Sequence, residues 1–177
     1  MKNICLQEIQ FQDETNITEV QLMRAGVFVH PFFEDFEITP EMFTSFKKNF
    51  DDNVKKIDLA VDYSHNSGEK AGGWIKEVIL KENNTQLWIL VDWTEAGRTA
   101  ILGGEFKYLS ADFSDNYTDN ETGEKFGPTL NGAGLTNRPF IKDMKAVLSD
   151  PETDLSEDKK TAILKIIEDK PIEKDTK

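Results

Sequence analysis

The stretch from Trp74 to Trp93, WIKEVILKENNTQLWILVDW, decides the fold of this chain. Apolar and β-branched residues dominate residues 74–81 and again residues 86–93, and a polar segment around Asn83-Asn84 separates the two runs. Two short runs of this kind on either side of a polar turn are typical of paired antiparallel strands. The stretch therefore predicts a β-hairpin at the centre of a mainly β structure.

Similar patterns on both sides of this hairpin predict the rest of the fold. Further strands are expected at Ile4–Phe11, Glu19–Val29 with an interruption at Gly26, Ile57–Tyr63, Phe106–Phe113 and Thr129–Asn137, with polar loops at 64–73 and 114–127. Thr39-Pro40-Glu41 begins a helix, because a hydroxyl at the cap, a proline at the first position and an acid in the first turn all favour a helix start. A shorter helix begins at Thr94 and ends at Gly103-Gly104. The pattern predicts an α+β protein, mainly β.

The length of 177 residues fits one domain and a tail. Residues 1–150 form the expected domain. Residues 151–177 are an acidic tail in which Leu155, Ala162, Ile163, Ile166 and Ile167 recur at helical spacing, which predicts a C-terminal amphipathic helix. The short apolar stripe favours docking on its own domain or a homodimer over a coiled coil.

Composition excludes several classes of function. A net charge of -12 argues against nucleic acid as a partner, since phosphate binding depends on Lys and Arg. The single Cys5 allows no internal disulfide and fits a reducing cytoplasm, and no Cys/His cluster has zinc-ligand spacing, so no cofactor is expected. No signal peptide and no apolar run of about 20 residues is present, which predicts a soluble protein that is neither secreted nor membrane-bound.

The strand Tyr108-Leu109-Ser110-Ala111-Asp112-Phe113 carries the candidate nucleophile. Side chains alternate along a strand, so Leu109, Ala111 and Phe113 face the core while Tyr108, Ser110 and Asp112 share the other face. A serine hydroxyl becomes a good nucleophile only when a neighbouring base removes its proton. The chain holds two histidines, His30 and His65, and His65 lies where a predicted strand ends and a polar loop begins.

Five ordered blocks resemble the phage Mu I-protein family of prohead proteases. The blocks are Leu59-Ala60-Val61-Asp62-Tyr63-Ser64-His65, Ala71-Gly72-Gly73-Trp74-Ile75, Val91-Asp92-Trp93-Thr94-Glu95-Ala96-Gly97, Tyr108-Leu109-Ser110 and Gly134-Leu135-Thr136-Asn137-Arg138-Pro139. The resemblance also includes Thr39-Pro40-Glu41 and the stretch around Asn49-Phe50, and it runs from about residue 18 to residue 148.

The resemblance implies a serine endopeptidase with a β-barrel ringed by helices, distantly similar to herpesvirus assemblins. Such an enzyme cleaves scaffold and major capsid proteins inside the assembling prohead in the host cytoplasm, and often cleaves itself. Its histidine precedes its serine in the chain, which matches His65 as general base and Ser110 as nucleophile. The helix in the tail at 151–177 would then be the stump of a scaffolding region, a partner-binding helix or a helix that closes the barrel.

A third catalytic residue is less well defined by the resemblance. Assemblins use a second histidine after the serine, and no histidine follows Ser110 here. The partner of the imidazole must then be an acid or an amide. Asn137 is the first choice, and the alternatives are Asp112, Asp62 and Asp143. Arg138 either supports the oxyanion or pairs with one of the many carboxylates.

Asp62 precedes His65 by three residues, a separation that points its side chain away if the strand continues straight. Two rival functions remain. One is a catalytically inactive scaffold or capsid-assembly module with the same fold. The other is a metal hydrolase using Asp62, His65 and Glu69, which offers few good ligands for a transition metal.

Overall fold

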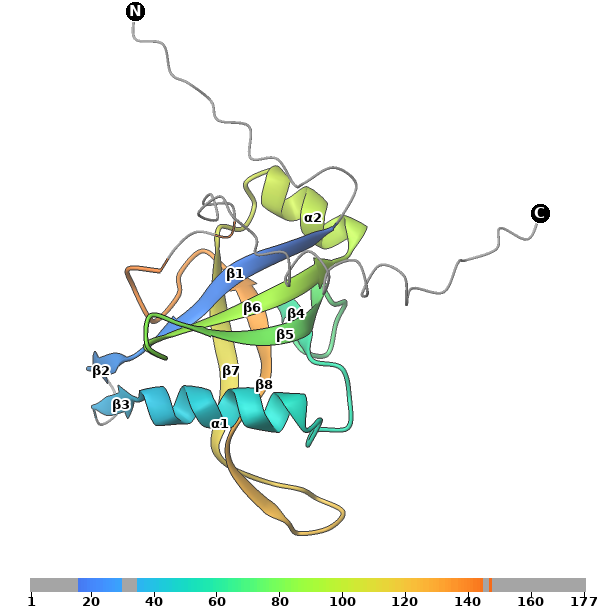
Figure 1. Cartoon of the computed structure of the whole chain (residues 1–177). Helices are drawn as coiled ribbons and strands as arrows, with labels where there is room; N and C mark the ends of the chain where they lie inside the picture. Colours follow the sequence, from blue (N-terminus) through green and yellow to red (C-terminus); the bar gives the residue numbers. More distant parts are fainter. Residues whose placement is uncertain (1–15, 30–34, 145–146, 148–177) are drawn as a thin grey trace, which may run out of the picture.

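The computed structural model describes residues 16–29, 35–144 and 147. Within these residues the chain forms eight strands and two helices (Figure 1): β1 (Ile17–Arg24), β2 (Gly26–Phe28), β3 (Phe36–Ile38), α1 (Pro40–Asp51), β4 (Ala60–Tyr63), β5 (Gly73–Lys81), β6 (Gln86–Trp93), α2 (Glu95–Leu102), β7 (Tyr108–Thr118) and β8 (Lys125–Thr136). The predicted class, α+β and mainly β, is confirmed for this part of the chain.

Six strands form one sheet in the order β1-β6-β5-β4-β8-β7. The hairpin predicted from residues 74–93 is confirmed as β5 and β6, whose register closes at Lys81 opposite Gln86. The pairing of β4 with β8 is parallel, whereas the other pairings in this sheet are antiparallel. The sheet curls into a half-barrel, so that β1, β6 and β5 cross in front of β7 and β8 in Figure 1.

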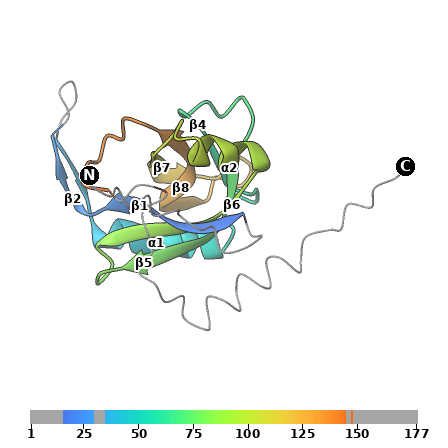
Figure 2. The same cartoon turned by 90° about the horizontal axis from the view of Figure 1, so that it is seen from above.

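Helix α1 packs across the open side of this curl, against β5 and β8 (Figures 1 and 2). The hydroxyl of its cap residue Thr39 accepts a hydrogen bond from the Met42 backbone N–H at 3.3 Å, and Pro40 occupies the first turn, as the sequence predicts. Phe43 and Phe46 are fully buried and supply the apolar face of the helix. Their burial joins α1 to the core of the sheet.

Helix α2 lies at the other end of the sheet, above β4 and β6 in Figure 1. Its cap residue Thr94 binds the carbonyl oxygen of Gly72 twice, through the backbone N–H at 2.9 Å and through the hydroxyl at 3.0 Å. Gly97 rests directly on the same peptide group, where an added Cβ would overlap the Gly72 carbonyl. The second helix therefore touches the sheet backbone to backbone.

One predicted loop is wrong. Residues 114–127 do not form an extended polar loop, because β7 continues to Thr118 and β8 begins at Lys125. The rings of Tyr117 and Phe126 stack at 6.0 Å and support this extension. Asp119 closes the turn by accepting the backbone N–H groups of Glu121 and Thr122 at 3.0 and 2.8 Å.

Other boundaries differ by less. The strand predicted at Ile57–Tyr63 begins at Ala60, and the one predicted at Glu19–Val29 is divided into β1 and β2. The predicted strand Ile4–Phe11, the tail helix Leu155–Asp169 and His30 lie outside the described residues.

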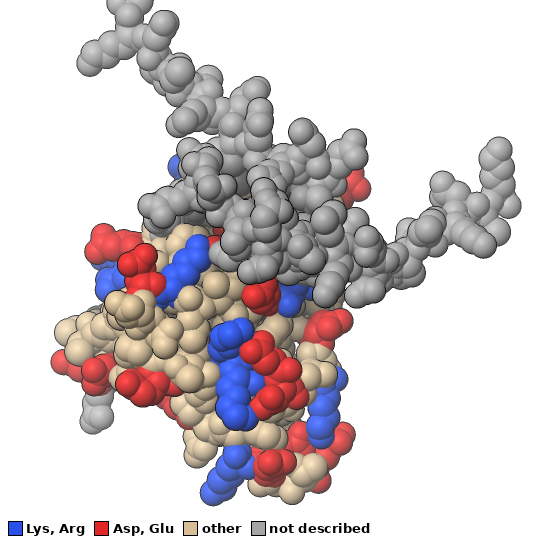
Figure 3. All heavy atoms as spheres, viewed as in Figure 1, with Lys and Arg blue, Asp and Glu red and all other residues tan. Residues whose placement is uncertain are grey.

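Charged side chains of both signs are interspersed on the face shown in Figure 3. Among the described residues, no helix is long and apolar enough to cross a membrane. The same part of the chain contains no group of three or more His, Cys, Asp or Glu side chains placed to hold a metal ion.

Candidate active site

Ser110 and Asp62 lie on one row that crosses three strands. Ser110 on β7 is paired with Gly134 on β8, and Gly134 is paired in turn with Asp62 on β4. Their strand neighbours Leu109 and Val61 are buried in the core, so the row itself faces outward, as alternation predicts for Ser110. With strands about 4.8 Å apart, the Cα atoms of Ser110 and Asp62 are about 10 Å from each other. A glycine between them leaves room for another group.

A tight turn after β4 brings His65 to this row. Ser64 and His65 both adopt positive φ angles, 55° and 59°, which is unusual for residues other than glycine. The turn is held by a hydrogen bond from the Ser64 N–H to the Leu135 carbonyl at 2.9 Å and by one from the Asn66 N–H to the Tyr63 carbonyl at 3.0 Å. The chain therefore does not continue straight past Asp62, and it places the exposed His65 over β8.

Gly134 is the point at which these groups meet. A Cβ built on Gly134 would lie 2.9 Å from the His65 backbone nitrogen, 3.2 Å from the His65 Nδ1 and 3.0 Å from the Asp62 Oδ1. The imidazole and the carboxylate thus lie within about one contact distance of a single position on β8, and Ser110 is directly opposite that position on β7. The structure brings Ser110, His65 and Asp62 together around Gly134.

The Asp62 carboxyl is held in an unfavourable setting for a charge. Burial raises the pKa of Asp62 above its ordinary value of 3.8, and the negative charge of Asp112 adds to this rise. The charge of His65 and its backbone N–H both act to lower the same pKa. Within the described residues, the buried Oδ1 of Asp62 has no hydrogen-bond partner. The neighbour that most favours the ionised carboxylate is therefore His65.

Asp112 and Asn137 lie near Ser110 but make other contacts. Asp112 is exposed, and its Oδ1 accepts a hydrogen bond from the Asn131 amide at 3.3 Å. The Asn137 amide binds the loop that leads into β7: its oxygen accepts the Lys107 N–H at 3.1 Å, and its nitrogen donates to the Glu105 carbonyl at 2.6 Å. Both polar ends of Asn137 thus hold the approach to Ser110. Its role as third catalytic residue stays a prediction.

The remaining two candidates are on the segment after β8. Asp143 is almost fully exposed and lies 3.9 Å from Arg24, an ion pair on the β1 side of the sheet. Arg138 is exposed, and its backbone N–H donates to the Thr136 hydroxyl at 3.0 Å. Thr136 is paired with Tyr108, two residues along the strand from Ser110, so Arg138 follows the end of the strand that forms the floor of the site.

A comparison with protein-family models matches the part of the chain that contains this site. The family model described as the Mu-like prophage I protein, N-terminal domain, matches residues 20–148. The chain belongs to the Mu-like prophage I protein family. No curated protein and no solved structure matches it. The matched residues of this I-protein domain include both helices and every residue of the row around Gly134.

Gly134 is a residue of this site that the sequence analysis of the I-protein domain does not predict. It belongs to the block Gly134-Leu135-Thr136-Asn137-Arg138-Pro139, which carried the family resemblance without a role for its first residue. The available signal was Asn131-Gly132-Ala133-Gly134, a strand with two glycines at alternate positions. Glycine inside a strand marks a bulge or a close approach by another group, and both occur here.

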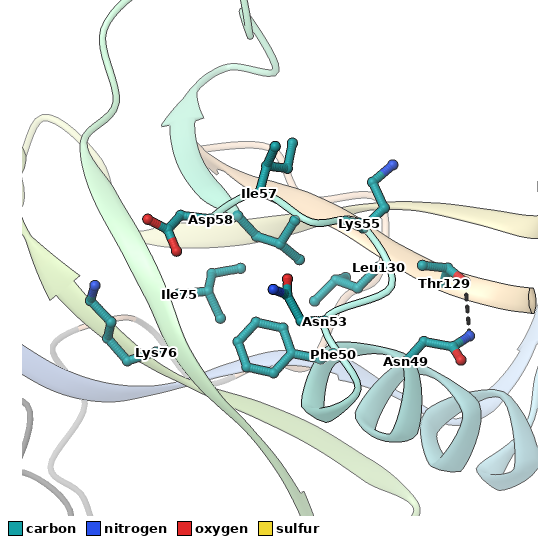
Figure 4. A pocket seen from close by; sticks show the side chains of 11 residues that line it. Asn49, Phe50, Asn53, Lys55, Ile57, Asp58, Ile75, Lys76, Thr129 and Leu130 are labelled. Carbon is teal, nitrogen blue, oxygen red and sulfur yellow. Dashed lines mark hydrogen bonds between the residues drawn. The ribbon is translucent and has the colours of Figure 1, made fainter. Parts of the chain in front are cut away.

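A partly open cavity of about 220 Å³ lies elsewhere, between the end of α1 and the strands β5 and β8 (Figure 4). Its lining includes Asn53, Lys55, Asp58 and Lys76. None of the residues predicted for the site lines this cavity. The candidate active site of the I-protein domain is therefore a row of strand residues on the outer face of the sheet, under the His65 turn and separate from this cavity.

Proposed function

We propose that this chain is a serine endopeptidase that matures phage proheads, with Ser110 as nucleophile and His65 as general base. Membership of the Mu-like prophage I protein family supports a phage-related role. The observation that carries the proposal is that the His65 ring lies on Gly134, directly opposite Ser110. Substrates are the scaffold and major capsid proteins of the assembling prohead in the host cytoplasm, and a distant relation to the assemblin fold belongs to the same proposal.

The chemistry follows from the two side chains. The Ser110 oxygen attacks the scissile carbonyl carbon while its proton passes to His65, and the carbonyl electron pair moves onto oxygen. The tetrahedral intermediate then expels the amine, which takes the proton from His65, and an acyl-enzyme remains. Water then gives a proton to the same imidazole as it attacks the acyl carbon, the ester bond to Ser110 breaks, the Ser110 oxygen takes the proton back from His65, and the product leaves as a carboxylic acid.

The position of Ser110 suits this role. Ser110 is half-buried on the outer face of the sheet, so it is partly shielded from bulk water and still accessible to a substrate. β7 is also the last strand of the sheet, with β8 as its ladder partner. The net charge of -12 agrees with a protein substrate better than with nucleic acid.

The test is to co-express Ser110→Ala, His65→Ala and the double variant with the scaffold protein of the same phage. Each single variant should lower cleavage on the order of 10⁴-fold, and the double variant should lower it no further, because the two residues act as a unit. Fragments are quantified by mass spectrometry, and circular dichroism verifies the fold. Ser114→Ala, a half-buried serine on the same strand, is the matched control and should leave cleavage unchanged.

Full processing by Ser110→Ala would contradict the proposal and favour the inactive capsid-assembly module. Losses that multiply in the double variant would assign independent roles to Ser110 and His65.

A further inference from the structure

We propose that Asp62 positions the His65 imidazole and that Gly134 must be glycine for His65 to occupy its place between Asp62 and Ser110. This inference rests on the proposed function and deepens it. Among the four candidates named from the sequence, Asp62 is the one whose carboxylate shares the position over Gly134 with the His65 ring.

The proposed pair also defines the roles of the two ring nitrogens. Nδ1 of His65 and Oδ1 of Asp62 are 3.2 and 3.0 Å from the same built Cβ position, although no hydrogen bond joins the two atoms in this structure. An N–H at Nδ1 that faces a carboxylate leaves Nε2 as the basic nitrogen, which is the tautomer needed to accept a proton from Ser110. In the proposed arrangement the His65 ring makes its hydrogen bonds to Asp62 and Ser110 when substrate binds, as is common for catalytic groups that are not in contact in the unliganded enzyme.

The burial of Asp62 points the same way. A buried carboxylate oxygen without a hydrogen-bond donor is rare in folded proteins, and each case calls for an explanation. Protonation of His65 during catalysis would place a cation beside this carboxylate and provide the missing stabilisation. Asp112 is the other charged group that acts on Asp62, and it disfavours the ionised carboxylate. The pair of Asp62 with His65 is thus strengthened when the imidazole is charged.

The competing candidates have other partners. Asn137 uses both its amide oxygen and its amide nitrogen on backbone groups of the loop before β7. Asp143 pairs with Arg24 on the β1 side. A chain that lacks a histidine after Ser110 therefore obtains its third group from β4, three residues before His65, through the turn at Ser64 and His65.

Gly134 is required because no side chain fits beneath the turn. An alanine methyl group would come within 2.9 Å of the His65 backbone nitrogen, which real Cβ atoms do not approach. The neighbours on this side are the His65 backbone nitrogen, the buried Asp62 carboxylate and the His65 ring, and none of them is the flexible end of a long side chain. Gly134→Ala should therefore displace His65 from Asp62 and Ser110 together.

The experiment measures the pH profile of kcat and KM for scaffold cleavage by wild type, Asp62→Asn and Asp62→Glu, with Asp115→Asn, an exposed acid on the same strand as Ser110, as the matched control. Asp62→Asn should lower kcat by at least about a hundredfold with little change in KM, and it should move the acid limb of the profile to lower pH, because the imidazole loses its anion. Asp62→Glu should restore part of kcat, and Asp115→Asn should leave it unchanged.

Urea unfolding separates the positioning role of Asp62 from a merely structural one. Since burial raises the pKa of Asp62, its charge opposes folding above pH 3.8. Under the proposal, Asp62→Asn should therefore unfold at an equal or higher urea concentration than wild type at pH 7. A loss of kcat accompanied by a fall in this midpoint, with the pH profile unmoved, would overturn the proposal.

A nitrogen-15 NMR titration of the histidines separates this inference from the proposed function. In the proposed arrangement the His65 proton is on Nδ1 in wild type, and Asp62→Asn changes the Nδ1 signal. His30→Gln assigns the two histidine spectra. If scaffold is not cleaved but this shift occurs, the pair stands and the protease activity fails. An unchanged His65 spectrum in Asp62→Asn refutes the pair whatever the activity.

Discussion

Replacement of Gly97 by alanine sets helix propensity against packing, and the contacts of α2 decide which effect is larger. Alanine at an ordinary helix position stabilises a protein by about 1 kcal/mol relative to glycine. At Gly97, however, an added Cβ would overlap the Gly72 carbonyl oxygen and lie 2.7 Å from its carbonyl carbon. The atoms in the way are backbone and cannot rotate aside, so the helix has to move.

The cost of that movement can be estimated from the bonds it weakens. Both hydrogen bonds from Thr94 to the Gly72 carbonyl, at 2.9 and 3.0 Å, lie at the point of contact, and each contributes about 0.5–1.5 kcal/mol. Overpacking of this kind adds about 1–3 kcal/mol. After subtraction of the helix propensity, Gly97→Ala should destabilise the protein by about 2 kcal/mol, and should lower Tm by about 4–8 °C in a chain of this size.

Urea unfolding followed by tryptophan fluorescence measures this change, since Trp93 is buried one residue before the cap of α2. Ala96→Gly is the matched control, because Ala96 is an exposed neighbour on the same helix and should lose about 1 kcal/mol from propensity alone. Both substitutions should therefore destabilise the protein, although one replaces glycine by alanine and the other replaces alanine by glycine. If Gly97→Ala is as stable as wild type or more stable, the backbone contact between α2 and Gly72 does not exist in solution.

Two further predictions concern residues outside the site. Asn49 is buried on α1, and its amide donates hydrogen bonds to the Phe126 and Pro128 carbonyls at 3.0 Å and to the Thr129 hydroxyl at 2.9 Å. Asn49→Leu should therefore lower the free energy of unfolding in urea by about 2–4 kcal/mol. A decrease below about 1 kcal/mol would show that these bonds do not join α1 to β8. Backbone N–H bonds, that of Thr122 first, lower the pKa of Asp119 to about 2, so its contribution to stability is present above about pH 4 and lost as pH falls toward 2. The difference in urea midpoint between wild type and Asp119→Asn should shrink over that range, and a constant difference would contradict the assignment.

Local patterns predicted the elements that depend on neighbouring residues. The hairpin β5–β6 followed from composition around Asn83-Asn84, and α1 followed from its capping residues at Thr39 and Pro40. Alternation along β7 correctly placed Ser110 on the face opposite Leu109. These predictions are correct because the sequence signal and the structural element span the same few residues.

The pairing of β4 with β8 could not be predicted in this way. It joins residues about 70 positions apart in parallel, and strand composition does not specify a partner at such a distance. The turn at Ser64 and His65 was equally hidden, because positive φ angles are expected at glycine or asparagine and neither residue is one of these. Neither the pairing nor the turn is visible in the sequence. A strand assumed to run straight past Asp62 therefore disfavours Asp62 and favours Asn137 as the third catalytic residue.

Two glycines of the blocks that resemble the family, Gly72 and Gly134, allow these blocks to pack closely against one another in the fold. Gly72 lies beneath α2, and a Cβ on it would meet the Tyr63 ring at 3.2 Å and the Leu135 side chain at 3.3 Å. Tyr63 is paired with Leu135 across β4 and β8, one residue beyond the pair of Asp62 with Gly134.

A side chain at Gly72 would thus push on the strand ends that carry the His65 turn, just as a side chain at Gly134 would push on His65 itself. The contact between α2 and Gly72 is therefore linked to the site around Gly134 through the packed side chains of Tyr63 and Leu135. Gly72→Ala should therefore impair scaffold cleavage as well as stability, even though Gly72 touches neither Ser110 nor His65.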